Sequence, residues 1–419
     1  MIESFRFIDL FAGIGGFHLA LSSLGGKCVF ASEIDPQASN IYAQNFSATK
    51  HMDGPIVGDI IPLTEPKVSD EIPHHDVLAA GFPCQPFSKG GFQRGINETR
   101  GTLFHNIAKI LEARKPKYLI LENVRNLTGP RHRHTWSLII RVLRDIGYYV
   151  SDQPTIFSPH LLPPDMGGSP QVRDRVFIFG KYVGKTKAWN LADEPFGIPY
   201  APVNGWDIRA WDLEAHLLFD EAQIRGQESK LSPGREQALD FWEELIQRIS
   251  PVSDSRRLPG FPLWEFAWVD EPVFDEETPD WKVDFLLKNS SFYKAHRVEI
   301  EKWRARHPEI QSIQNSYRKL EWQAGLNDSI WKGAIQFRPS GIRVKKADYL
   351  PALVAMNQTS FIGPRRRDIV VGEAARLQGF PDNFDFEGQQ TSQSFKQLGN
   401  AVSVGAVKYV FSEFLKLAG

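Results

Sequence analysis

The chain has 419 residues, 42% of them hydrophobic, and its formal net charge at pH 7 is -1. This length and composition predict a globular protein with a full hydrophobic core, divided into two domains. No run of about 18 or more apolar residues occurs, which excludes a transmembrane helix. The only cysteines, Cys28 and Cys84, lie far apart without a C-x-x-C pair, so neither a disulfide framework nor a zinc site is expected.

The charge and the start of the chain restrict the function further. A strand pattern begins directly after Met1-Ile2-Glu3, so we expect no signal peptide and a cytoplasmic protein. A charge near zero is unusual for a nucleic-acid-binding protein, although a local basic stripe suffices for phosphate contacts. The histidines at 74–75, 132 and 134 lack the company of metal ligands, and we assign them to the surface.

The first elements predict a cofactor site. Arg6 to Phe11 is a short apolar strand that leads into a turn containing Gly13, Gly15 and Gly16, followed by apolar residues at helical spacing. Such a glycine turn lets the backbone approach a ligand at a helix N-terminus. His18 stands where the dinucleotide fingerprint has its third glycine. The turn therefore favours an adenosine-containing cofactor other than a nicotinamide.

Two acidic residues follow the next strands. The strand Cys28–Ser32 ends at Glu33, about twenty residues after Gly13, where an acidic group commonly meets ribose hydroxyls. The strand 56–58 ends at Asp59. One acid is expected to hold the ribose and the other the adenine amine, whereas a solvated strand end is the alternative for each.

The apolar run from Asp76 to Ala80 ends in the turn Gly81-Phe82-Pro83-Cys84. A cysteine just past the carboxyl end of a parallel strand is placed to act as a thiolate nucleophile. A buried, inert cysteine is the alternative. The basic, glycine-rich segment 89–95 follows and is predicted to be a mobile loop over a substrate.

A second group of candidate catalytic residues is predicted further along the chain. Helices are expected at 103–111 and 136–146, and a weaker strand at 148–157. The buried strand Tyr118–Leu121 delivers Glu122 as a candidate acid, unless this residue only caps a helix or forms a salt bridge. Arg173 and Arg175 alternate before the strand 176–179 and therefore point to one side.

The composition and the residue pattern change in the middle of the chain. Ten of the eleven tryptophans lie beyond residue 188, and strand-helix alternation stops from about 184 to 345. This region predicts a second domain or a large insertion. Its later part carries a basic stretch that we expect to face DNA, unless it is ordinary solvated surface: Lys332, Arg338, Arg343, Lys345 and Lys346. The apolar helix that ends at Leu417 is expected to dock on the first domain.

Taken together, these residues resemble the prokaryotic, restriction-modification type of cytosine-5 DNA methyltransferase. The resemblance covers residues 5–180 and 349–417. It is carried by motifs in family order: DLFAGIGGF from Asp9, GFPCQPFS from Gly81, RGTLF from Arg100, ENV from Glu122, Q-x-R-x-R from Gln171, ARLQGFPD from Ala375 and QLGNAV from Gln397.

The family implies an α/β architecture, namely a Rossmann-like S-adenosylmethionine-dependent methyltransferase fold with an inserted smaller target-recognition domain. Residues 1–183 and 397–419 would form the discontinuous catalytic domain, and 184–396 the target-recognition domain and hinge. The expected partner is double-stranded DNA. A functional pairing with a restriction endonuclease, a monomeric state and no membrane contact are also implied.

The resemblance also implies a mechanism. Cys84 would add to a flipped-out cytosine, Glu122 would hold the ring nitrogen 3 proton, and Arg175 would hold oxygen 2 with support from Arg173. Methyl transfer from S-adenosylmethionine to carbon 5 would leave S-adenosylhomocysteine. Phe11 would stack near adenine and Asn400 would complete the pocket. The implied cofactor-binding residues are Phe11, Gly13, Gly15, Gly16, Glu33, Ile34, Asp59, Pro83 and Asn400, and the implied DNA-binding residues are Gln85, Ser88, Arg94, Arg338 and Arg343.

One position departs from the family pattern. Gly372 precedes Glu373 where the family generally has arginine, so a stabilising contact is either absent or supplied by Arg365, Arg366 or Arg367. The middle region matches no family motif, so no recognition residue carries over.

Rival functions remain. A tRNA cytosine-5 methyltransferase shares the catalytic motifs, although a large recognition insertion favours DNA. A catalytically silent DNA-binding regulator is disfavoured by intact Cys84, Glu122 and Arg175. A nicotinamide dehydrogenase is disfavoured because this chain lacks the third glycine of the dinucleotide fingerprint. A thymidylate synthase is disfavoured because its chemistry would not use the adenosine site.

Overall fold

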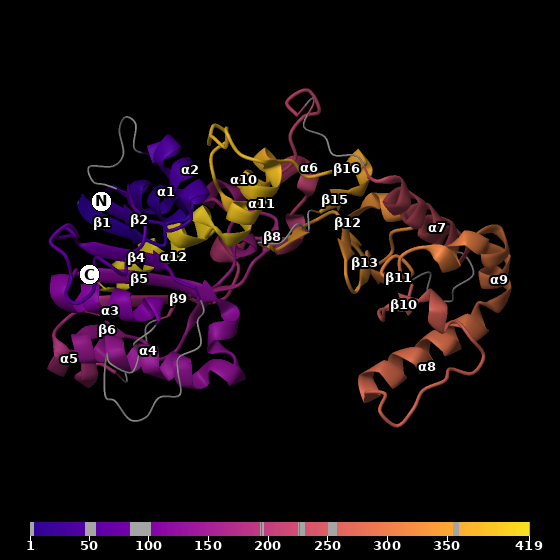
Figure 1. Cartoon of the computed structure of the whole chain (residues 1–419), viewed down its shortest axis with the longest axis horizontal. Helices are drawn as coiled ribbons and strands as arrows, with labels where there is room; N and C mark the ends of the chain where they lie inside the picture. Colours follow the sequence, from indigo (N-terminus) through magenta and orange to yellow (C-terminus); the bar gives the residue numbers. More distant parts are fainter. Residues whose placement is uncertain are drawn as a thin grey trace. The chain divides into compact units, whose positions relative to one another are not determined.

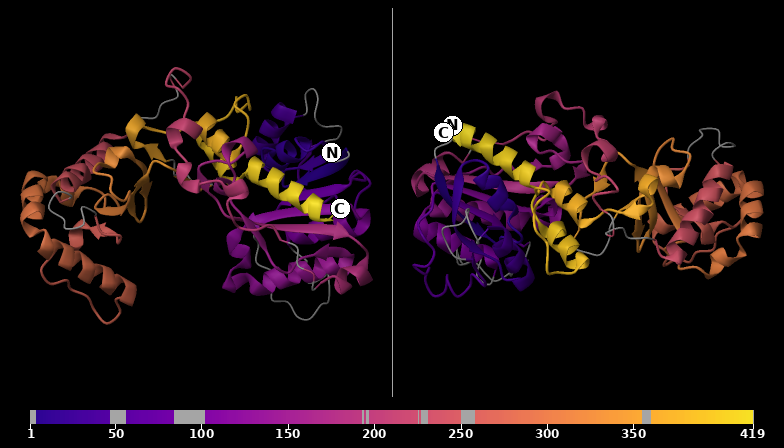
Figure 2. Two further views of the ribbon diagram at one scale, coloured as in Figure 1. Left: turned by 180° about the vertical axis from the view of Figure 1, so that it is seen from behind. Right: turned by 90° about the horizontal axis from the view of Figure 1, so that it is seen from above.

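The computed structural model describes residues 4–46, 56–83, 102–192, 194, 197–224, 226, 231–249, 258–354 and 360–418. The chain divides into two compact units, which Figure 1 and Figure 2 show as ribbons. Unit 1 comprises Met1–Ala210, Ala352–Met356 and Ala374–Gly419, and unit 2 comprises Trp211–Pro351 and Asn357–Glu373. Within the described ranges no helix is long and apolar enough to cross a membrane.

Unit 1 is built on one sheet whose described strands follow the order β3-β2-β1-β4-β5-β9-β6, with β7 pairing with β9. The parallel strands are β1 (Phe5–Leu10), β2 (Gly26–Ser32), β3 (Ile56–Val57), β4 (Val77–Gly81) and β5 (Tyr118–Val124). Strand β9 (Arg175–Tyr182) runs antiparallel to β5. Strands β6 (Tyr148–Val150) and β7 (Thr155–Phe157) both pair with β9 and run antiparallel to it. The order of the parallel strands reverses between β1 and β4, which is where open α/β sheets bind ligands.

Helices lie on this sheet (Figure 2). The helices of unit 1 are α1 (Gly16–Ser22), α2 (Pro36–Phe46), α3 (Leu103–Arg114), α4 (Arg133–Ile146), α5 (Lys185–Asn190), α11 (Thr391–Asn400) and α12 (Val404–Ala418), and α10 (Val371–Gln378) lies where the chain passes from unit 2 to unit 1. The last helix is apolar because it packs against the sheet: the ring of Phe414 stacks on Phe179 with centroids 5.1 Å apart, and Phe411 meets the edge of Phe5 at 6.3 Å. The carboxyl-terminal segment therefore completes the core of unit 1.

The boundaries of the compact units differ from those predicted for the domains. Residues 184–210 and 374–396, predicted to belong to the second domain, lie in unit 1. Side chains explain this placement, because Arg144 donates to the carbonyl of Ala192 at 3.3 Å, and Ser169 donates to that of Leu377 at 2.8 Å. The short strands β8 (Gln171–Val172) and β14 (Leu350–Pro351) belong to unit 1 and unit 2 respectively.

Unit 2 has its own sheet and its own core. Its strands are β10 (Leu263–Trp264), β11 (Lys319–Gln323), β13 (Gly341–Lys346), β12 (Gly333–Arg338), β15 (Phe361–Ile362) and β16 (Arg367–Asp368), in this spatial order. Its helices are α6 (Leu213–His216), α7 (Pro233–Ile249), α8 (Asp280–Ala295) and α9 (Arg297–Arg306).

The tryptophans of the middle region are the centre of this second core. Trp242, Trp268 and Trp303 are buried and contact one another, with ring centroids 5.9 to 6.2 Å apart. Each ring N–H has an acceptor, since Trp242 donates to the carbonyl of Tyr317 and Trp303 to that of Phe241, both at 2.8 Å, and Trp268 donates to Asn289 at 3.1 Å. The abundance of tryptophan therefore reflects packing in unit 2.

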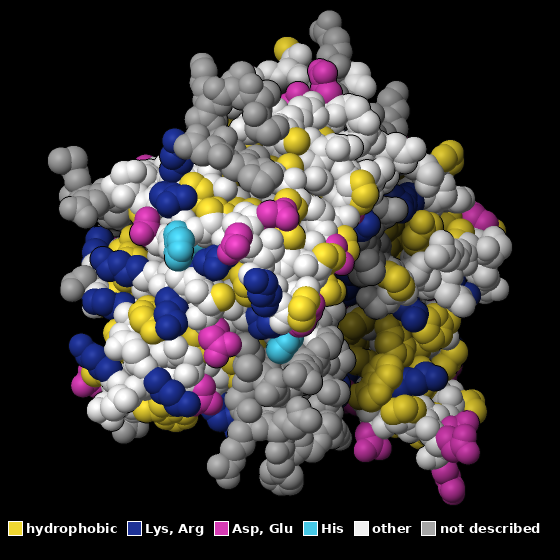
Figure 3. All heavy atoms as spheres, turned by 60° about the vertical axis from the view of Figure 1, so that its left-hand side comes forward, with side chains coloured by type: hydrophobic (Ala, Val, Ile, Leu, Met, Phe, Trp, Pro, Cys, Tyr) yellow, Lys and Arg dark blue, Asp and Glu magenta, His cyan; other side chains and the backbone are white. Residues whose placement is uncertain are grey.

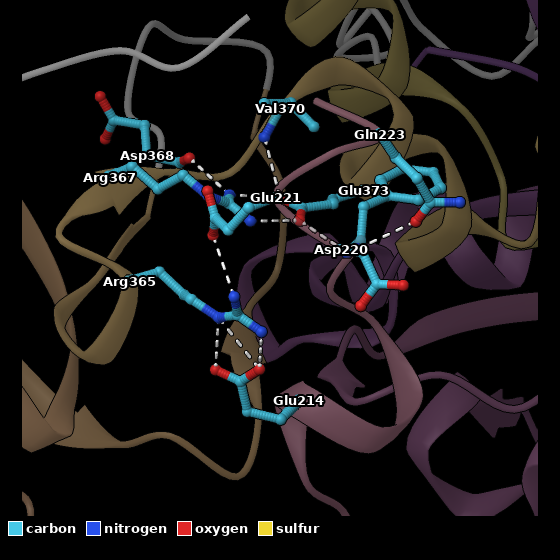
Figure 4. Close-up of polar contacts among 10 residues, drawn as sticks. Glu214, Asp220, Glu221, Gln223, Arg365, Arg367, Asp368, Val370 and Glu373 are labelled. Carbon is cyan, nitrogen blue, oxygen red and sulfur yellow. Dashed lines mark hydrogen bonds and ion pairs between the residues drawn. The ribbon is translucent and has the colours of Figure 1, made fainter. Parts of the chain in front are cut away.

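Gly372 stands where the family generally has arginine, and the structure shows which residue contacts Glu373 instead. A Cβ atom at this position would lie 2.7 Å from the ring of Phe219, so Phe219 fills the space that a larger side chain would need. The partner of Glu373 is Arg367, whose two terminal nitrogens contact the carboxylate at 2.8 and 2.9 Å (Figure 4). Glu373 also accepts from the backbone N–H groups of Phe219 and Val370, each at 3.0 Å. Of the three arginines named as candidates, Arg367 supplies the contact.

Candidate active site

A cavity of about 370 Å³ lies at the carboxyl ends of β1, β2, β4 and β5, beside the end of α11. Ten of the predicted site residues line it: Phe11, Gly13, Gly16, Glu33, Ile34, Pro83, Glu122, Arg173, Arg175 and Asn400. They come from segments up to almost 400 positions apart in the sequence, and the parallel strands bring them to one edge of the sheet. The predicted residues Cys84, Gln85, Ser88 and Arg94 lie outside the described residues.

The glycine turn forms one wall of the cavity. Phe11, Gly13 and Gly15 all have positive φ, at 57°, 55° and 91°. A Cβ atom on Gly15 would lie 2.2 Å from the ring of Phe46, and one on Gly16 would lie 2.7 Å from Val402. Glycine at these two positions therefore allows close packing of α1 against α2 and the carboxyl-terminal segment, and Gly15 itself does not line the cavity.

Glu33 ties this turn to the next strand. One of its carboxylate oxygens accepts from the backbone N–H of Gly13 at 2.7 Å, and the other accepts from that of Asp35 at 2.8 Å. Each oxygen keeps a second lone pair for another donor, such as a sugar hydroxyl. Asp59, the other predicted acid, is exposed, accepts from the N–H of Ile61 at 2.9 Å, and does not line the cavity.

His18 occupies the position of the third glycine in the dinucleotide fingerprint. Its ring is buried, stacks on Phe46 with centroids 4.0 Å apart, and lies 2.7 Å from the hydroxyl of Tyr42. The position is therefore occupied by a packed aromatic side chain beneath the turn.

Glu122 and Arg175 form the chemical centre of the opposite wall. The carboxylate of Glu122 is 8% exposed, and its Oε1 lies 2.9 Å from Nε of Arg175. Burial raises the pKa of Glu122, and the charge of Arg175 opposes this rise. A raised pKa favours the protonated carboxyl, which is the form that a general acid uses.

Asn123, the middle residue of the ENV motif, is a further residue of the site, to which the motif alone assigns no role. Its side-chain amide donates to the carbonyl of Phe82 at 2.8 Å, two residues before Cys84. The amide therefore joins the carboxyl ends of β4 and β5. The polar residue within the ENV motif was the available signal for this role.

Arg173, which is expected to support Arg175, lines the cavity with it, and its guanidinium donates to three backbone carbonyls: Leu353 at 2.6 Å, Gly399 at 2.8 Å and Ala401 at 2.9 Å. The side chain is 2% exposed, and burial lowers its pKa to about 9. Arg173 thus holds the backbone on both sides of Asn400, which makes it a positioning residue.

The predicted DNA-binding arginines lie in unit 2. Arg338 on β12 and Arg343 on β13 both contact one carboxylate, that of Glu321 on β11, at 2.5 and 2.9 Å. One acid thus faces two cations, so the group keeps a net positive charge.

Unit 1 has the Rossmann-like methyltransferase fold. Its sheet carries the glycine turn and the buried Glu122-Arg175 pair next to the point where the strand order reverses. The profile described as C-5 cytosine-specific DNA methylase matches residues 5–416, and the chain belongs to this family. It is therefore a DNA (cytosine-5)-methyltransferase, and the family implies a methyl donor of the S-adenosylmethionine type.

Two named methyltransferases are similar to this chain over nearly its whole length. Type II methyltransferase M.AluI of Cellulosimicrobium cellulans is 38% identical over 98% of this chain and 92% of its own length. Type II methyltransferase M.HhaI of Haemophilus parahaemolyticus is also 38% identical, over 98% of this chain and 94% of its own. Among solved structures, the S. pombe Dnmt2 methyltransferase aligns over 99% of both chains with 19% identity and a TM-score of 0.43.

Proposed function

We propose that this enzyme methylates carbon 5 of a flipped-out cytosine in a specific double-stranded DNA sequence, through a covalent adduct with Cys84. The observation that carries the proposal is the buried Glu122-Arg175 pair in the same cavity as the glycine turn. Nitrogen 3 and oxygen 2 of cytosine are both acceptors, and a protonated Glu122 beside Arg175 would offer a donor to each.

The cavity fits S-adenosylmethionine. Its volume of about 370 Å³ suits a small-molecule ligand, and the backbone of Gly13 and the carboxylate of Glu33 lie at its wall. When bound, S-adenosylmethionine supplies a methyl group on a sulfonium centre. Phe11, Glu33, Ile34 and Asn400 would hold it, and Asp59 is proposed to reach its adenine amine.

The Cys84 thiolate is proposed to add to carbon 6 of the cytosine, because carbon 5 is a poor nucleophile until this addition makes the ring enamine-like. Carbon 5 then takes the methyl group and loses its proton, and the electron pair of that C–H bond expels the thiolate. Pro83, the residue before Cys84 in the sequence, lines the cavity and is consistent with this role.

Glu122 would supply the nitrogen 3 proton during addition and recover it during elimination. Arg175 would hold oxygen 2, since its Nε contacts Glu122 while Nη2 has no acceptor among the described residues. The target carbon is inaccessible inside a duplex, so the base must be flipped at a cost of a few kcal/mol. Gln85, Ser88 and Arg94 are proposed to contact the DNA as the 88–95 loop closes.

Unit 2 is proposed to read the DNA sequence, and the enzyme to act as a monomer that protects DNA from a restriction endonuclease. Bisulfite sequencing of plasmid DNA from cells that express the protein would reveal its activity and its target together. Methylation confined to tRNA would favour the RNA alternative, and no methylation of any nucleic acid would favour a silent regulator.

The covalent step has its own test. A duplex with 5-fluorocytosine at the target should trap a denaturant-stable complex with the wild-type enzyme, because fluorine cannot leave as a proton. The Cys84→Ala variant should bind DNA and cofactor but form no adduct and transfer no methyl group. Methyl incorporation by this variant above background would refute the nucleophile.

A further inference from the structure

The amino-terminal edge of the unit 1 sheet carries a group of basic side chains with no role in the proposed reaction. Arg6 lies at the start of β1, Lys115 and Lys117 directly precede β5, and Arg114 ends α3. Together with His74, His75, Asp76 and Tyr182 they line a surface depression of about 440 Å³. Figure 3 brings forward the left-hand side of Figure 1, and Lys and Arg side chains are numerous on that face, with some Asp and Glu side chains between them.

Most of these cations make few contacts among the described residues, although the amino group of Lys117 lies 5.0 Å from the centroid of the Tyr118 ring. Arg114 is the exception, because it donates to the carbonyls of Ile72 and Ser69, both at 2.7 Å. Arg6, Lys115 and Lys117 are exposed, and no described carboxylate forms an ion pair with any of them. Asp76 is the acid among the lining residues, and one of its oxygens accepts from the backbone N–H of Arg6 at 2.7 Å. His75, which was expected at the surface, is buried, and burial lowers its pKa to about 4.

The cations continue along the edge in the order of the strands. Lys27 on β2 is in register with Arg6 on β1, and Lys117 precedes Tyr118, which is aligned through Val77 with Phe7, the neighbour of Arg6. Adjacent strands lie about 4.8 Å apart, so the series from β2 to β5 spans roughly 14 Å. A linear series of cations suits a polymer with evenly spaced negative charges, and duplex DNA carries one charge per about 1.7 Å of its axis.

We propose that this basic edge, defined by Arg6, Lys115 and Lys117, is a second DNA-binding surface that contacts backbone phosphates. It lies at the opposite ends of the strands from the cavity, about 20 Å away along β5. It therefore binds a DNA segment other than the one that carries the target cytosine. The contact is independent of sequence and holds the enzyme near DNA between methylation events.

A charge-removing variant tests the proposal. Arg6→Gln, Lys115→Gln and Lys117→Gln are combined in one protein, and the control combines Arg141→Gln, Lys67→Gln and Lys408→Gln, which removes the same residue types from exposed positions elsewhere in unit 1. Each phosphate contact contributes about 0.9 to the slope of log affinity against log salt. For a long duplex without the target, the slope should fall by about 1 to 3 in the test variant and remain at the wild-type value in the control.

A bridging experiment separates this surface from the active site. Enzyme held on an immobilised short target duplex should retain a second, labelled duplex without the target, and the test variant should retain several-fold less. Methylation of the short duplex should be unchanged in both variants, so a loss of activity and a loss of bridging are distinguishable. Equal salt slopes or equal bridging in the test and control variants would overturn the proposal.

Discussion

Two buried Glu-Arg pairs, one in each unit, differ in how completely the carboxylate is satisfied. Glu373 in unit 2 is fully buried and accepts four hydrogen bonds, two from Arg367 and two from backbone N–H groups (Figure 4). Glu122 in unit 1 faces a cavity, and Arg175 is its one ion-pair partner among the described residues. A buried carboxylate with all its acceptor sites filled is suited to hold structure, whereas one with open sites is suited to exchange protons.

The largest expected effect comes from Glu122→Gln. The amide keeps the shape but cannot supply a proton, so the single-turnover rate should fall by about 10²- to 10⁴-fold. DNA and cofactor affinities should change little. The measurement is rapid-quench methyl transfer at saturating substrates. A rate close to that of the wild type would remove Glu122 from the chemistry and erase the contrast between the two pairs.

The same variant has a pH signature. Burial raises the pKa of Glu122 in the folded state above the value of about 4.3 expected in the unfolded chain, so folding favours the protonated form. The unfolding free energy of the wild type, relative to Glu122→Gln, should therefore be highest below about pH 4.3 and fall as the pH rises through the raised pKa. Urea titrations of both proteins across this range would test the direction. An opposite slope would mean that Arg175 outweighs burial.

Removal of Arg367 should give the opposite result, namely a large loss of stability and little loss of chemistry. In Arg367→Met the buried Glu373 loses its charged partner, and breaking such a pair costs about 3–5 kcal/mol. Arg365→Gln is the control, because Arg365 pairs with the more exposed Glu214 and Glu221 and should cost about 0–1 kcal/mol. Denaturant unfolding provides the free energies. Equal costs for the two variants would contradict the assigned role of Glu373.

Glu33→Ala should weaken cofactor binding by about 1–3 kcal/mol, because it leaves polar partners unpaired. DNA affinity measured without cofactor should stay near the wild-type value. Calorimetric titration with S-adenosylmethionine is the direct measurement. Unchanged cofactor affinity would limit Glu33 to its hydrogen bonds with Gly13 and Asp35.

The smallest effects are expected for Arg338→Ala and Arg343→Ala in unit 2. A base contact should relax one position of the methylated sequence at a cost of about 1–3 kcal/mol, whereas a phosphate contact should lower affinity for all sequences alike. Because both arginines share Glu321, the effect of the double variant should differ from the sum of the single ones. Methylation of randomised duplexes would distinguish the two kinds of contact. Wild-type behaviour in all three variants would exclude these residues from recognition.

The sequence predicted unit 1 well because its strands are short apolar runs bounded by turn residues. The strand expected at Tyr118–Leu121 is β5, and the helix expected at 136–146 lies within α4. The strand expected at 148–157 is two strands, β6 and β7, separated by a segment that contains Pro154. Proline cannot donate to a strand ladder, so the interruption follows from its chemistry.

Other features could not be predicted because they depend on contacts between distant residues. Arg173 meets the carbonyl of Leu353, 180 positions away, and no local pattern marks a carbonyl as its partner. Unit 2 lacked a strong hydrophobic period. In α8 the apolar residues are not confined to one face, since Trp281 and Leu287 are exposed, and α9 is largely polar. The core of unit 2 also depends on tryptophans from several elements. The partner of Glu373 could be narrowed to three arginines, but the choice of Arg367 required the fold.

The contact between Arg173 and Leu353 limits how the enzyme can be recombined. Residues 352–356 belong to unit 1 although unit 2 residues flank them on both sides, so the polypeptide passes between the units four times. Unit 2 is therefore not a single continuous cassette. A graft that replaced 211–373 with the segment of a relative would also exchange Leu353, whose carbonyl Arg173 contacts, and the foreign chain would have to offer a carbonyl at the same place. Chimeras that keep residues 352–356 of the recipient should fold more often than those that replace them, and natural exchange of sequence specificity among such enzymes would face the same constraint.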